Sequence, residues 1–502
     1  MTARTTGNLA DLVRDAAAAT PDKAALLFGD QTITWAGLDA LVSSAARGLL
    51  ALGLEHGDRV AVHLGNTPDF PVVYFGALRA GLVAVPVNTG YTASELTHVL
   101  TDSGARVIVT AAATAATVEG LTAGPEHVIV AGAPSYEALL ADEMLPDETA
   151  MASSGGGEDL AVVLYTSGTS GRPRGAMLTH RALLANLEQT ARIDPPVVDH
   201  DDVVLLVLPL FHVFGLNAAL GSVAWHGATG VLAERFDPVE TLELLRRHAV
   251  TNVAGAPPMY VAWSMLPDVG DAFASVRLAL SGAAPLPPNV LHRVLDVTGH
   301  HVFEGYGLTE TAPVLTTTLM SEVAKPGSIG QPVPGVELRL LDEQGQPVEE
   351  GDPGEVVVRG ANLFSGYWPD GAEGPDANGW FATGDVAVLD DDGDLCLVDR
   401  RRELVLVSGF NVYPREVEDV LSRLEGVAEV AVIGIPHPYT GESVKALVVL
   451  EEGVQLTADD VIGHCARSLA RFKCPTAVEF VAELPHSATG KVSKGRLREL
   501  ST

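Results

Sequence analysis

Residues 165 to 175 read Tyr165-Thr166-Ser167-Gly168-Thr169-Ser170-Gly171-Arg172-Pro173-Arg174-Gly175, a short segment that combines glycines, hydroxyl side chains and two guanidinium groups. Such a segment can cradle a polyphosphate, because glycines with φ above zero turn backbone N–H groups inward and arginines add paired hydrogen bonds. We expect all three of its glycines, including Gly175, to take such conformations. Residues 160–164 read as a buried strand and residues 179–184 as the opening of an amphipathic helix, which predicts a strand-to-helix turn.

The segment is not a Walker P-loop, because Pro173 stands where the second glycine is required and no Lys-Ser/Thr pair follows. By composition alone it is equally compatible with a surface turn. A second segment is Phe303-Glu304-Gly305-Tyr306-Gly307-Leu308-Thr309-Glu310-Thr311, which we expect to form a glycine-bearing loop after a strand over 301–303. Its carboxylate, Glu310, is either solvated or a hard oxygen ligand of the kind that Mg²⁺ prefers.

Four more segments carry residues that suit either an ordinary turn or a ligand. Asp385 ends a Gly-Trp-Phe-Ala-Thr-Gly-Asp stretch, where an aspartate commonly caps a turn. Lys491 ends a Pro-His-Ser-Ala-Thr-Gly-Lys stretch, and most lysines are simply solvated. The stretches 209–215 and 281–285 are apolar or small, and the first contains His212.

From residue 20 to 400, short β-branched runs alternate with helical patterns, which is typical of an α/β fold with mostly parallel sheets. Asp237-Pro238 predicts the start of a helix that continues through residues 241–248, because an N-cap residue is followed by a proline at the first helical position. After the charged junction at residues 399–403 the pattern changes to a small α+β arrangement, with a helix that starts at Pro414. We expect a large N-terminal body over 1–400 and a small C-terminal lid over 401–502.

In this order, the segments closely resemble the signature motifs of the adenylate-forming superfamily, which comprises acyl-CoA synthetases, aryl-CoA ligases, luciferases and the adenylation domains of peptide synthetases. The resemblance runs from residue 32 to Lys491 and implies that the lid is mobile. The sequence departs from the family pattern at Arg174, where the family usually has lysine. A planar guanidinium group therefore replaces a compact ammonium group.

The resemblance implies an AMP-forming acyl-CoA synthetase that uses ATP, Mg²⁺ and coenzyme A. It places nucleotide contacts on Thr166, Ser167, Gly168, Thr169, Ser170, Gly171, Arg174, Ala283, Ala284, Glu304, Gly305, Tyr306, Gly307, Thr309, Asp385 and Arg400. It places catalysis on Lys491, Thr309, Glu310 and His212, with Glu310 also the metal ligand. It places the acyl pocket at His212, Val213, Met259, Gly282 and Gly307, the CoA tunnel at Ser408, Gly409 and Phe410, and the hinge at Arg402.

Two features bear on the acid that is activated. No acidic residue follows Phe211 until Glu234, whereas amino-acid-activating domains place an aspartate shortly after that phenylalanine. Residues 257–263 are apolar where ligases of diacids present an arginine. The pattern favours a hydrophobic monocarboxylic acid, either fatty, aryl or terpenoid. The stretch between Gly354 and Asp385 holds no obvious inserted segment, which favours CoA over a carrier protein as the acceptor of the acyl group. The alternatives are an acyl-AMP ligase that loads a carrier protein and a nonenzymatic relative that binds a nucleotide.

Composition limits the partners. A formal net charge of −32 argues against nonspecific nucleic-acid binding, which needs a basic face. We find no apolar run long enough to cross a bilayer and no signal-peptide pattern, and the three cysteines lack zinc-site spacing, so we expect a cytoplasmic protein with reduced thiols. The sequence leaves open whether two copies form a homodimer.

Overall fold

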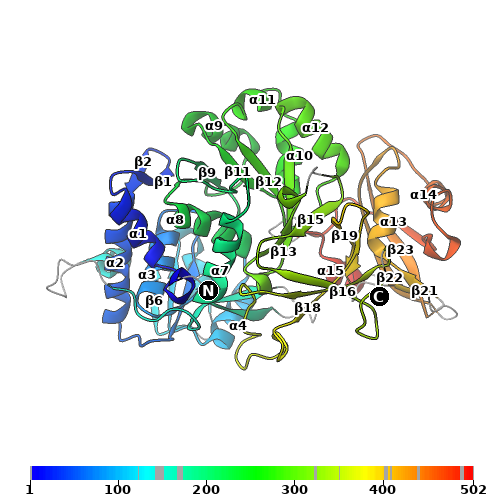
Figure 1. Cartoon of the computed structure of the whole chain (residues 1–502). Helices are drawn as coiled ribbons and strands as arrows, with labels where there is room; N and C mark the ends of the chain where they lie inside the picture. The colour runs from blue at the N-terminus through cyan, green and yellow to red at the C-terminus, as the bar shows by residue number, and fades with distance from the viewer. Residues whose placement is uncertain are drawn as a thin grey trace. The chain divides into compact units, whose positions relative to one another are not determined.

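The computed structural model describes residues 3–121, 124–141, 152–166, 173–321, 325–349, 351–400, 405–407, 410–437, 441–486 and 491–500. It divides into two compact units (Figure 1). Unit 1 comprises Met1–Glu337 and Arg359–Phe381, and unit 2 comprises Leu338–Val358 and Ala382–Thr502. The expected boundary at 400/401 concerns motion of a lid, which this division does not test, so it stays a prediction.

The first sheet of unit 1 is built from short and mostly buried strands in the order β6-β5-β3-β4-β7-β8. Its strands are parallel except β8, which runs antiparallel to β7. Their bounds are β3 (Arg59–His63), β4 (Val83–Pro86), β5 (Val107–Thr110), β6 (His127–Val130), β7 (Leu160–Thr166) and β8 (Arg174–Thr179).

The second sheet of unit 1 has the order β15-β14-β13-β12-β11-β9-β10-β1-β2. The strands from β13 to β1 in this order are parallel, whereas β2, β14 and β15 pair antiparallel. Their bounds are β1 (Ala24–Phe28), β2 (Gln31–Thr34), β9 (Val203–Leu206), β10 (Thr229–Leu232), β11 (Asn252–Gly255), β12 (Leu278–Ser281), β13 (Val302–Gly307), β14 (Val314–Thr317) and β15 (Ser328–Pro332). The prediction of mostly parallel α/β architecture is confirmed.

Helices cover these sheets, and in Figure 1 the green helices α9 to α12 gather around β9, β11 and β12. The helix predicted to follow Asp237 is confirmed, because the Asp237 carboxylate accepts hydrogen bonds from the backbone of Val239 and Glu240 at 2.9 Å. The helices of unit 1 are α1 (Asp11–Ala19), α2 (Trp35–Ala51), α3 (Asp69–Arg79), α4 (Ala93–Ser103), α5 (Ala115–Glu119), α6 (Pro134–Leu140), α7 (His180–Ala191), α8 (Ser222–His226), α9 (Pro238–His248), α10 (Pro257–Ser264), α11 (Val269–Ala272) and α12 (Pro288–Thr298).

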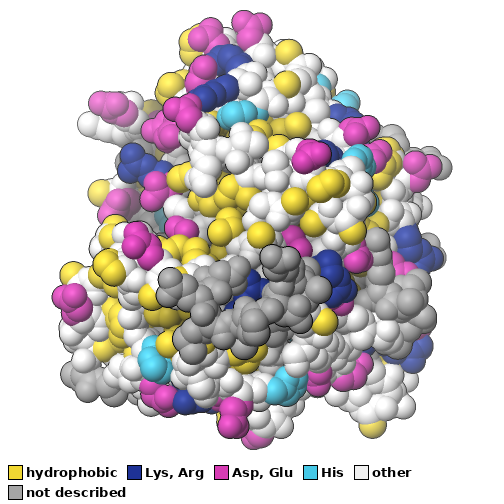
Figure 2. Space-filling view, turned by 90° about the vertical axis from the view of Figure 1, so that its left-hand side faces the viewer, with side chains coloured by type: hydrophobic (Ala, Val, Ile, Leu, Met, Phe, Trp, Pro, Cys, Tyr) yellow, Lys and Arg dark blue, Asp and Glu magenta, His cyan; other side chains and the backbone are white. Residues whose placement is uncertain are grey.

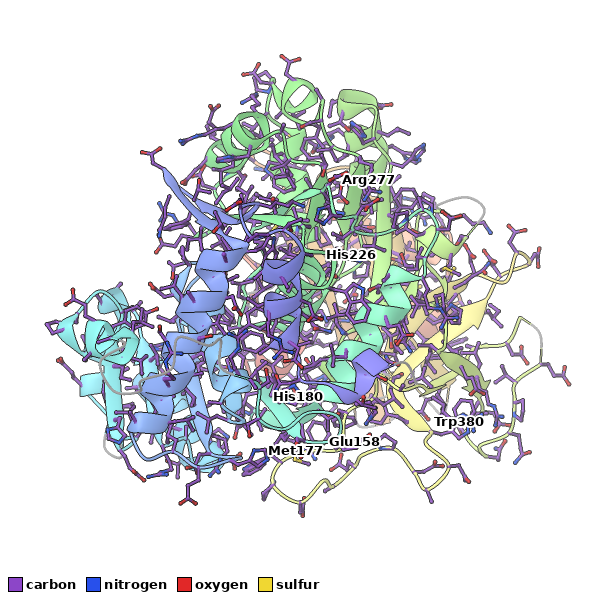
Figure 3. All side chains as sticks on the ribbon, turned by 60° about the vertical axis from the view of Figure 1, so that its left-hand side comes forward. Glu158, Met177, His180, His226, Arg277 and Trp380 are labelled. Atoms are coloured by element: carbon purple, nitrogen blue, oxygen red, sulfur yellow. The ribbon has the colours of Figure 1, made fainter. Side chains whose placement is uncertain are left out.

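Helix α7 shows how unit 1 ties distant segments together. The Thr179 hydroxyl caps the helix by accepting from the backbone of Ala182 at 3.1 Å. The next residue, His180, is labelled in Figure 3. It is buried, and its Nδ1 accepts from the backbone N–H of Leu9 at 3.0 Å. Burial lowers the pKa of His180 to about 4, so the ring stays neutral and keeps this acceptor.

Unit 2 contains two runs of paired strands. One comprises β16 (Glu337–Leu341), β17 (Gly354–Arg359), β18 (Phe381–Leu389) and β19 (Leu395–Arg400), in that order. The other has the order β21-β20-β23-β22, with β24 beside β23. Its elements are β20 (Val405–Val407), β21 (Phe410–Val412), α13 (Pro414–Leu421), β22 (Val427–His437), β23 (Gly441–Leu450), α14 (Ala458–Ala466), β24 (Ala477–Phe480) and α15 (Lys494–Leu500). The predicted α+β pattern and the helix starting at Pro414 are confirmed.

The surface carries the excess of acidic residues. Figure 2 shows Asp and Glu side chains spread over the visible face, in keeping with the formal net charge of −32. In the described ranges, no helix combines the length and the apolar character that crossing a membrane requires.

Candidate active site

Four of the sequence segments follow four neighbouring parallel strands. The strands β9, β11, β12 and β13 lie side by side in the sheet and point the same way (Figure 1). The His212 segment follows β9, Met259 follows β11, Gly282 follows β12, and Glu310 follows β13. Parallel α/β sheets bind ligands beyond the carboxyl ends of their strands. The fold therefore gathers at one edge residues that are separated by about a hundred positions in the chain.

The glycine-bearing segment is more ordered than the sequence predicts. The expected loop after residue 303 is wrong, because β13 continues to Gly307 and Gly305 and Tyr306 pair with Thr317 and Thr316 of β14. Gly307 is required here: a Cβ atom on it would lie 1.7 Å from the carbonyl oxygen of Pro313. The turn that carries Thr309 and Glu310 comes only after this strand.

Three buried asparagines that sequence reasoning missed hold the backbone beyond Glu310. Their side-chain N–H groups donate to carbonyl oxygens of this turn, namely Asn362 to Thr311 at 2.7 Å, Asn217 to Ala312 at 2.7 Å and Asn186 to Val314 at 2.8 Å. The turn needs such support because Ala312 has a φ of +64°, which is strained for a residue with a Cβ. An asparagine inside an apolar helical stretch, as at Asn186 and Asn217, was the available signal, since a buried amide requires partners.

The residues on either side of residues 167–172 form a β-hairpin. The predicted strand-to-helix turn is wrong, because Thr166 at the end of β7 lies opposite Arg174 at the start of β8, and helix α7 begins only at His180. Ser167, Gly168, Thr169, Ser170, Gly171 and Arg172 lie outside the described residues. Thr166 and Arg174 therefore flank the base of this segment.

Gly175 is glycine for a different reason from the one expected. It lies in extended β8 and is not among the glycines with positive φ. A Cβ atom on Gly175 would lie 2.6 Å from Val163 and 3.3 Å from both Tyr165 and Trp368. Close packing of side chains, not an inward-turned N–H group, excludes any larger residue.

Arg174 and Glu310 approach one side chain from two directions. The Arg174 guanidinium carbon lies 3.8 Å from the centroid of the Tyr367 ring, and the Tyr367 hydroxyl donates to Glu310 Oε1 at 2.5 Å. Arg174 also pairs with Glu373 at 3.0 Å. This pairing with Glu373 raises the pKa of the Arg174 guanidinium, which therefore keeps its full charge.

An apolar cluster lies beside the polar edge. Leu208, Ala254 and Ala256 are buried together, and Phe214, Met259 and Leu280 pack against them. Gly282 belongs to the same region, since a Cβ atom on it would lie 2.9 Å from the Phe214 ring and 3.4 Å from the carbonyl oxygen of Gly305. His212 is half-buried, and its Nδ1 accepts from the backbone N–H of Phe214 at 3.3 Å. Val213 instead packs in the large core of unit 1.

The turn after β12 shows the strain that accompanies many binding sites. Ala283 has a φ of +70°, a conformation that costs a residue with a Cβ about 1 kcal/mol or more. Its neighbour Ala284 is half-buried, and the turn ends where Leu286 N donates to Glu304 Oε1 at 2.9 Å. Glu304 is thus engaged with the backbone of the adjacent strand connection.

Seven predicted residues belong to unit 2, namely Asp385, Arg400, Arg402, Ser408, Gly409, Phe410 and Lys491. Asp385 is a buried strand residue that lies directly opposite Arg400 in the β18/β19 pair, so the fold brings these two together. Lys491 is half-buried and precedes Val492, which forms a β-bridge with His486. Arg402, Ser408 and Gly409, and the side chains of Arg400 and Phe410, lie outside the described residues.

The carboxylate of Glu310 could serve as a ligand of a metal ion. Glu310 is half-buried and supplies a hard oxygen ligand. In the described part of the chain, no group of three or more His, Cys, Asp or Glu side chains is arranged to hold a metal ion. A single carboxylate suits Mg²⁺, which takes its other ligands from water and from nucleotide phosphates.

Comparisons with known proteins agree with this geometry. A family model described as AMP-binding enzyme matches residues 13–368, and one described as AMP-binding enzyme C-terminal domain matches residues 416–491. The chain is 36% identical, over an alignment of 529 positions, to a long-chain-fatty-acid–CoA ligase of Escherichia coli O157:H7, covering 98% of this chain and 94% of the relative. It is 38% identical over 482 aligned residues to a feruloyl-CoA synthase of an Amycolatopsis species, covering 95% and 96%.

Among solved structures, ATP-bound MatB from Rhodopseudomonas palustris superposes with a TM-score of 0.90 at 33% identity and covers 98% of both chains. The matched segments include the parallel strands, the turn that carries Thr309 and Glu310, and the β7–β8 hairpin described above. The chain belongs to the adenylate-forming AMP-binding enzymes and, among them, to the AMP-forming acyl-CoA synthetases, which use ATP, Mg²⁺ and coenzyme A.

Proposed function

We propose that this enzyme joins a hydrophobic monocarboxylic acid, either fatty, aryl or terpenoid, to coenzyme A. The carboxylate attacks the α-phosphate of ATP and expels pyrophosphate, which gives an acyl-adenylate. The thiol of CoA then attacks the acyl carbon and expels AMP, so the overall products are acyl-CoA, AMP and pyrophosphate.

The observation that carries the proposal is the apolar cluster at the carboxyl ends of β9, β11 and β12. The cluster consists of Leu208, Ala254, Ala256, Phe214, Met259 and Leu280, and none of these side chains carries a charge. A diacid or an amino acid would leave its second charged group against such a surface without a partner, which is costly. The activities of the two named relatives, on long-chain fatty acids and on a feruloyl group, support a fatty or an aryl acid.

The chain's own groups would act mainly through charge and position. Lys491 would bridge the carboxylate and the α-phosphate as charge develops, and Thr309 would contact that phosphate. Glu310 would hold Mg²⁺, which neutralises charge on the phosphates. His212 would sit between the acyl and nucleotide pockets, and Tyr306 would stack on adenine.

Other residues would recognise the rest of the substrates. Asp385 would accept hydrogen bonds from the ribose hydroxyls, with Arg400 at the same sugar; their opposed positions on β18 and β19 support this pairing. Ser408, Gly409 and Phe410 would line the CoA tunnel after residues 401–502 turn about Arg402.

The test is pyrophosphate release with ATP, Mg²⁺ and a panel of fatty, aryl, polycyclic and dicarboxylic acids, with and without CoA. Mass detection of acyl-AMP and acyl-CoA identifies the acid and the acceptor. We expect acid-dependent release for hydrophobic monocarboxylates and for no diacid, and loss of acyl-AMP formation in Lys491→Ala. Acyl-AMP that never passes to CoA would instead favour loading of a carrier protein, and preference for a diacid would refute the proposal.

A further inference from the structure

The segment Arg359–Phe381 returns to unit 1 and runs along strand β8. We call it the strap. Its backbone is tied to β8 by hydrogen bonds from Met177 N to Gly366 O at 3.0 Å, from Ser365 N to Met177 O at 2.9 Å and from Trp368 N to Gly175 O at 2.8 Å. These bonds fix the strap on both sides of Tyr367, so the position of this side chain is set by backbone pairing.

The strap also fixes the residue that would bind the metal. Phe364 N donates to the backbone oxygen of Glu310 at 2.9 Å, and the Tyr367 hydroxyl donates to the Glu310 carboxylate at 2.5 Å. The Phe364 ring packs edge to face on the Tyr367 ring at 5.1 Å between centroids. Glu310 is therefore held at its backbone and at its side chain by one short piece of chain.

The hydroxyl of Tyr367 is a neutral donor, and it reaches the carboxylate of Glu310 directly. A hydrogen bond from a neutral donor to a carboxylate is among the stronger kinds in proteins.

The opposite face of Tyr367 serves Arg174. The guanidinium carbon stands 3.8 Å from the ring centroid, within the range of a cation–π contact. The other partner of Arg174, Glu373, has a side chain that is 60% exposed, so their ion pair is screened by water and salt. The ring is thus the more rigid of the two contacts, and it suits arginine because a planar guanidinium stacks on an aromatic face better than an ammonium group does.

We propose that Tyr367 is a positioning residue for adenylation: its hydroxyl orients Glu310 toward Mg²⁺ and its ring orients Arg174 toward the nucleotide phosphates. The proposal rests on the proposed function, which assigns those two roles. The Tyr367 side chain would then link the β7–β8 hairpin, which carries Arg174, to the turn that carries Glu310.

The test uses Tyr367→Phe, which removes the hydroxyl and keeps the ring. Calorimetry would measure binding of the α,β-methylene analogue of ATP, which cannot transfer its adenylyl group, with Mg²⁺ and without it. We expect about tenfold weaker binding of the analogue in the presence of Mg²⁺, because the variant loses one hydrogen bond to a charged group. In the absence of Mg²⁺ we expect the affinity to change by less than about twofold. Equal binding with Mg²⁺, or the same loss with and without it, would overturn the proposal.

The matched control is Tyr74→Phe, which removes a tyrosine hydroxyl from the buried core of helix α3, and it should leave both affinities unchanged. If Tyr367→Phe does not fold, Arg174→Lys tests the part of the proposal in which the Tyr367 ring orients Arg174. This variant should weaken binding of the analogue roughly threefold whether or not Mg²⁺ is present. Unchanged binding would contradict that role of the ring.

A second readout separates this proposal from the proposed function. Tyr367→Phe should slow pyrophosphate release but leave the transfer of a supplied acyl-AMP to CoA at the wild-type rate, whereas a general structural defect would slow both. If the wild-type enzyme releases no pyrophosphate with any acid, the proposed function fails, while the effect of Mg²⁺ on analogue binding still decides the role of Tyr367.

Discussion

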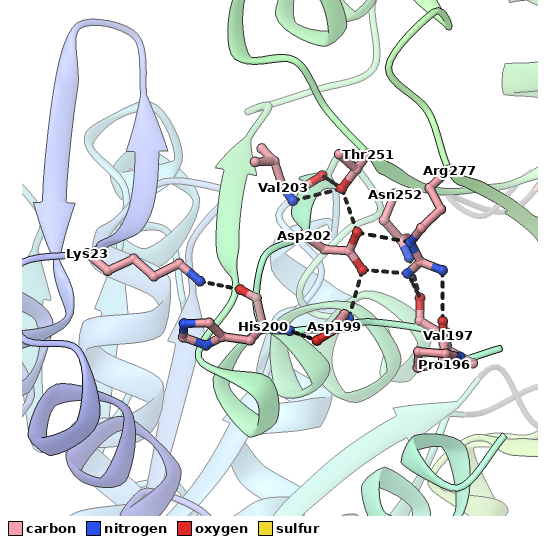
Figure 4. A network of polar contacts seen from close by, with 10 residues as sticks. All are labelled: Lys23, Pro196, Val197, Asp199, His200, Asp202, Val203, Thr251, Asn252 and Arg277. Carbon is pink, nitrogen blue, oxygen red and sulfur yellow. Dashed lines mark hydrogen bonds and ion pairs between the residues drawn. The ribbon is translucent and has the colours of Figure 1, made fainter. Parts of the chain in front are cut away.

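Replacing Arg277 with methionine should destabilise unit 1 without touching the active site. Arg277 donates to both carboxylate oxygens of Asp202, at 3.2 and 2.5 Å, and the same carboxylate accepts from the Thr251 hydroxyl and from the backbone of Asp199, each at 2.7 Å (Figure 4). This network lies before β9 and β11, at the opposite ends of the strands from the predicted binding residues. Arg277→Met keeps the packing of the aliphatic part of the side chain, and it leaves the buried carboxylate of Asp202 without its counter-ion.

The size and pH dependence of the effect follow from burial. Asp202 is 5% exposed and Arg277 37% exposed. Breaking a fully buried pair costs about 3–5 kcal/mol, and partial exposure of the arginine reduces this to about 2–3 kcal/mol at pH 7. Burial works to raise the pKa of Asp202, but the hydrogen bonds from Arg277, Thr251 and Asp199 outweigh it, and the net pKa is lowered. In the wild type this stabilisation is present above the unfolded pKa and is lost as pH falls through the folded pKa.

In the variant, burial dominates and the carboxyl should protonate at a higher pH, which relieves the buried charge. The Tm difference between wild type and variant should therefore be about 3 °C at pH 7 and should narrow toward pH 4.5. Calorimetric unfolding at several pH values measures it. Arg247→Met is the matched control, because it breaks an exposed pair with Asp30 whose side chains are 49% and 95% exposed, and it should shift Tm by less than 1 °C. Equal shifts in the two variants, or a difference independent of pH, would refute the reasoning.

Three further predictions concern single positions. Gly282→Ala should push the Phe214 ring aside, since the new methyl would lie 2.9 Å from it, and should lower kcat/KM for bulky acids more than for short ones; a uniform change across an acid panel would contradict this. Gly307→Ala should abolish pyrophosphate release and lower Tm, because its Cβ would lie 1.7 Å from the Pro313 oxygen; wild-type Tm and activity would refute it. Tyr74→Phe should raise stability by up to about 1 kcal/mol, because no described residue partners its buried hydroxyl, and denaturant unfolding should show no loss.

Local signals were sufficient for many elements. Asp237-Pro238 predicted the start of α9 because capping and the fixed φ of proline act within one turn of helix. Pro414 predicted the start of α13 for the same reason. Alternation of apolar runs with helical patterns predicted the parallel sheets, since only buried strands tolerate continuous apolar sequence.

The errors share one physical cause. Strand β8 was missed because its residues 174–179 pair with β7 and with the strap, and a strap residue such as Gly366 lies almost two hundred positions away. Likewise β13 extends through Gly305 and Tyr306 because β14 is there to pair with it. Glycine-rich composition suggested loops in both places, and tertiary hydrogen bonding overrode that local preference.

The sequence by itself determined the fold class, the family and the chemical types available at the site, because motif chemistry and hydrophobic periodicity are local properties of the chain. Only the tertiary structure decided which of those groups meet. It placed the segments of His212, Met259, Gly282 and Glu310 at the ends of four neighbouring strands, and it supplied partners that carry no motif, namely the three buried asparagines and Tyr367. The physical reason is that strand order and side-chain contact depend on long-range pairing, which composition and spacing do not encode.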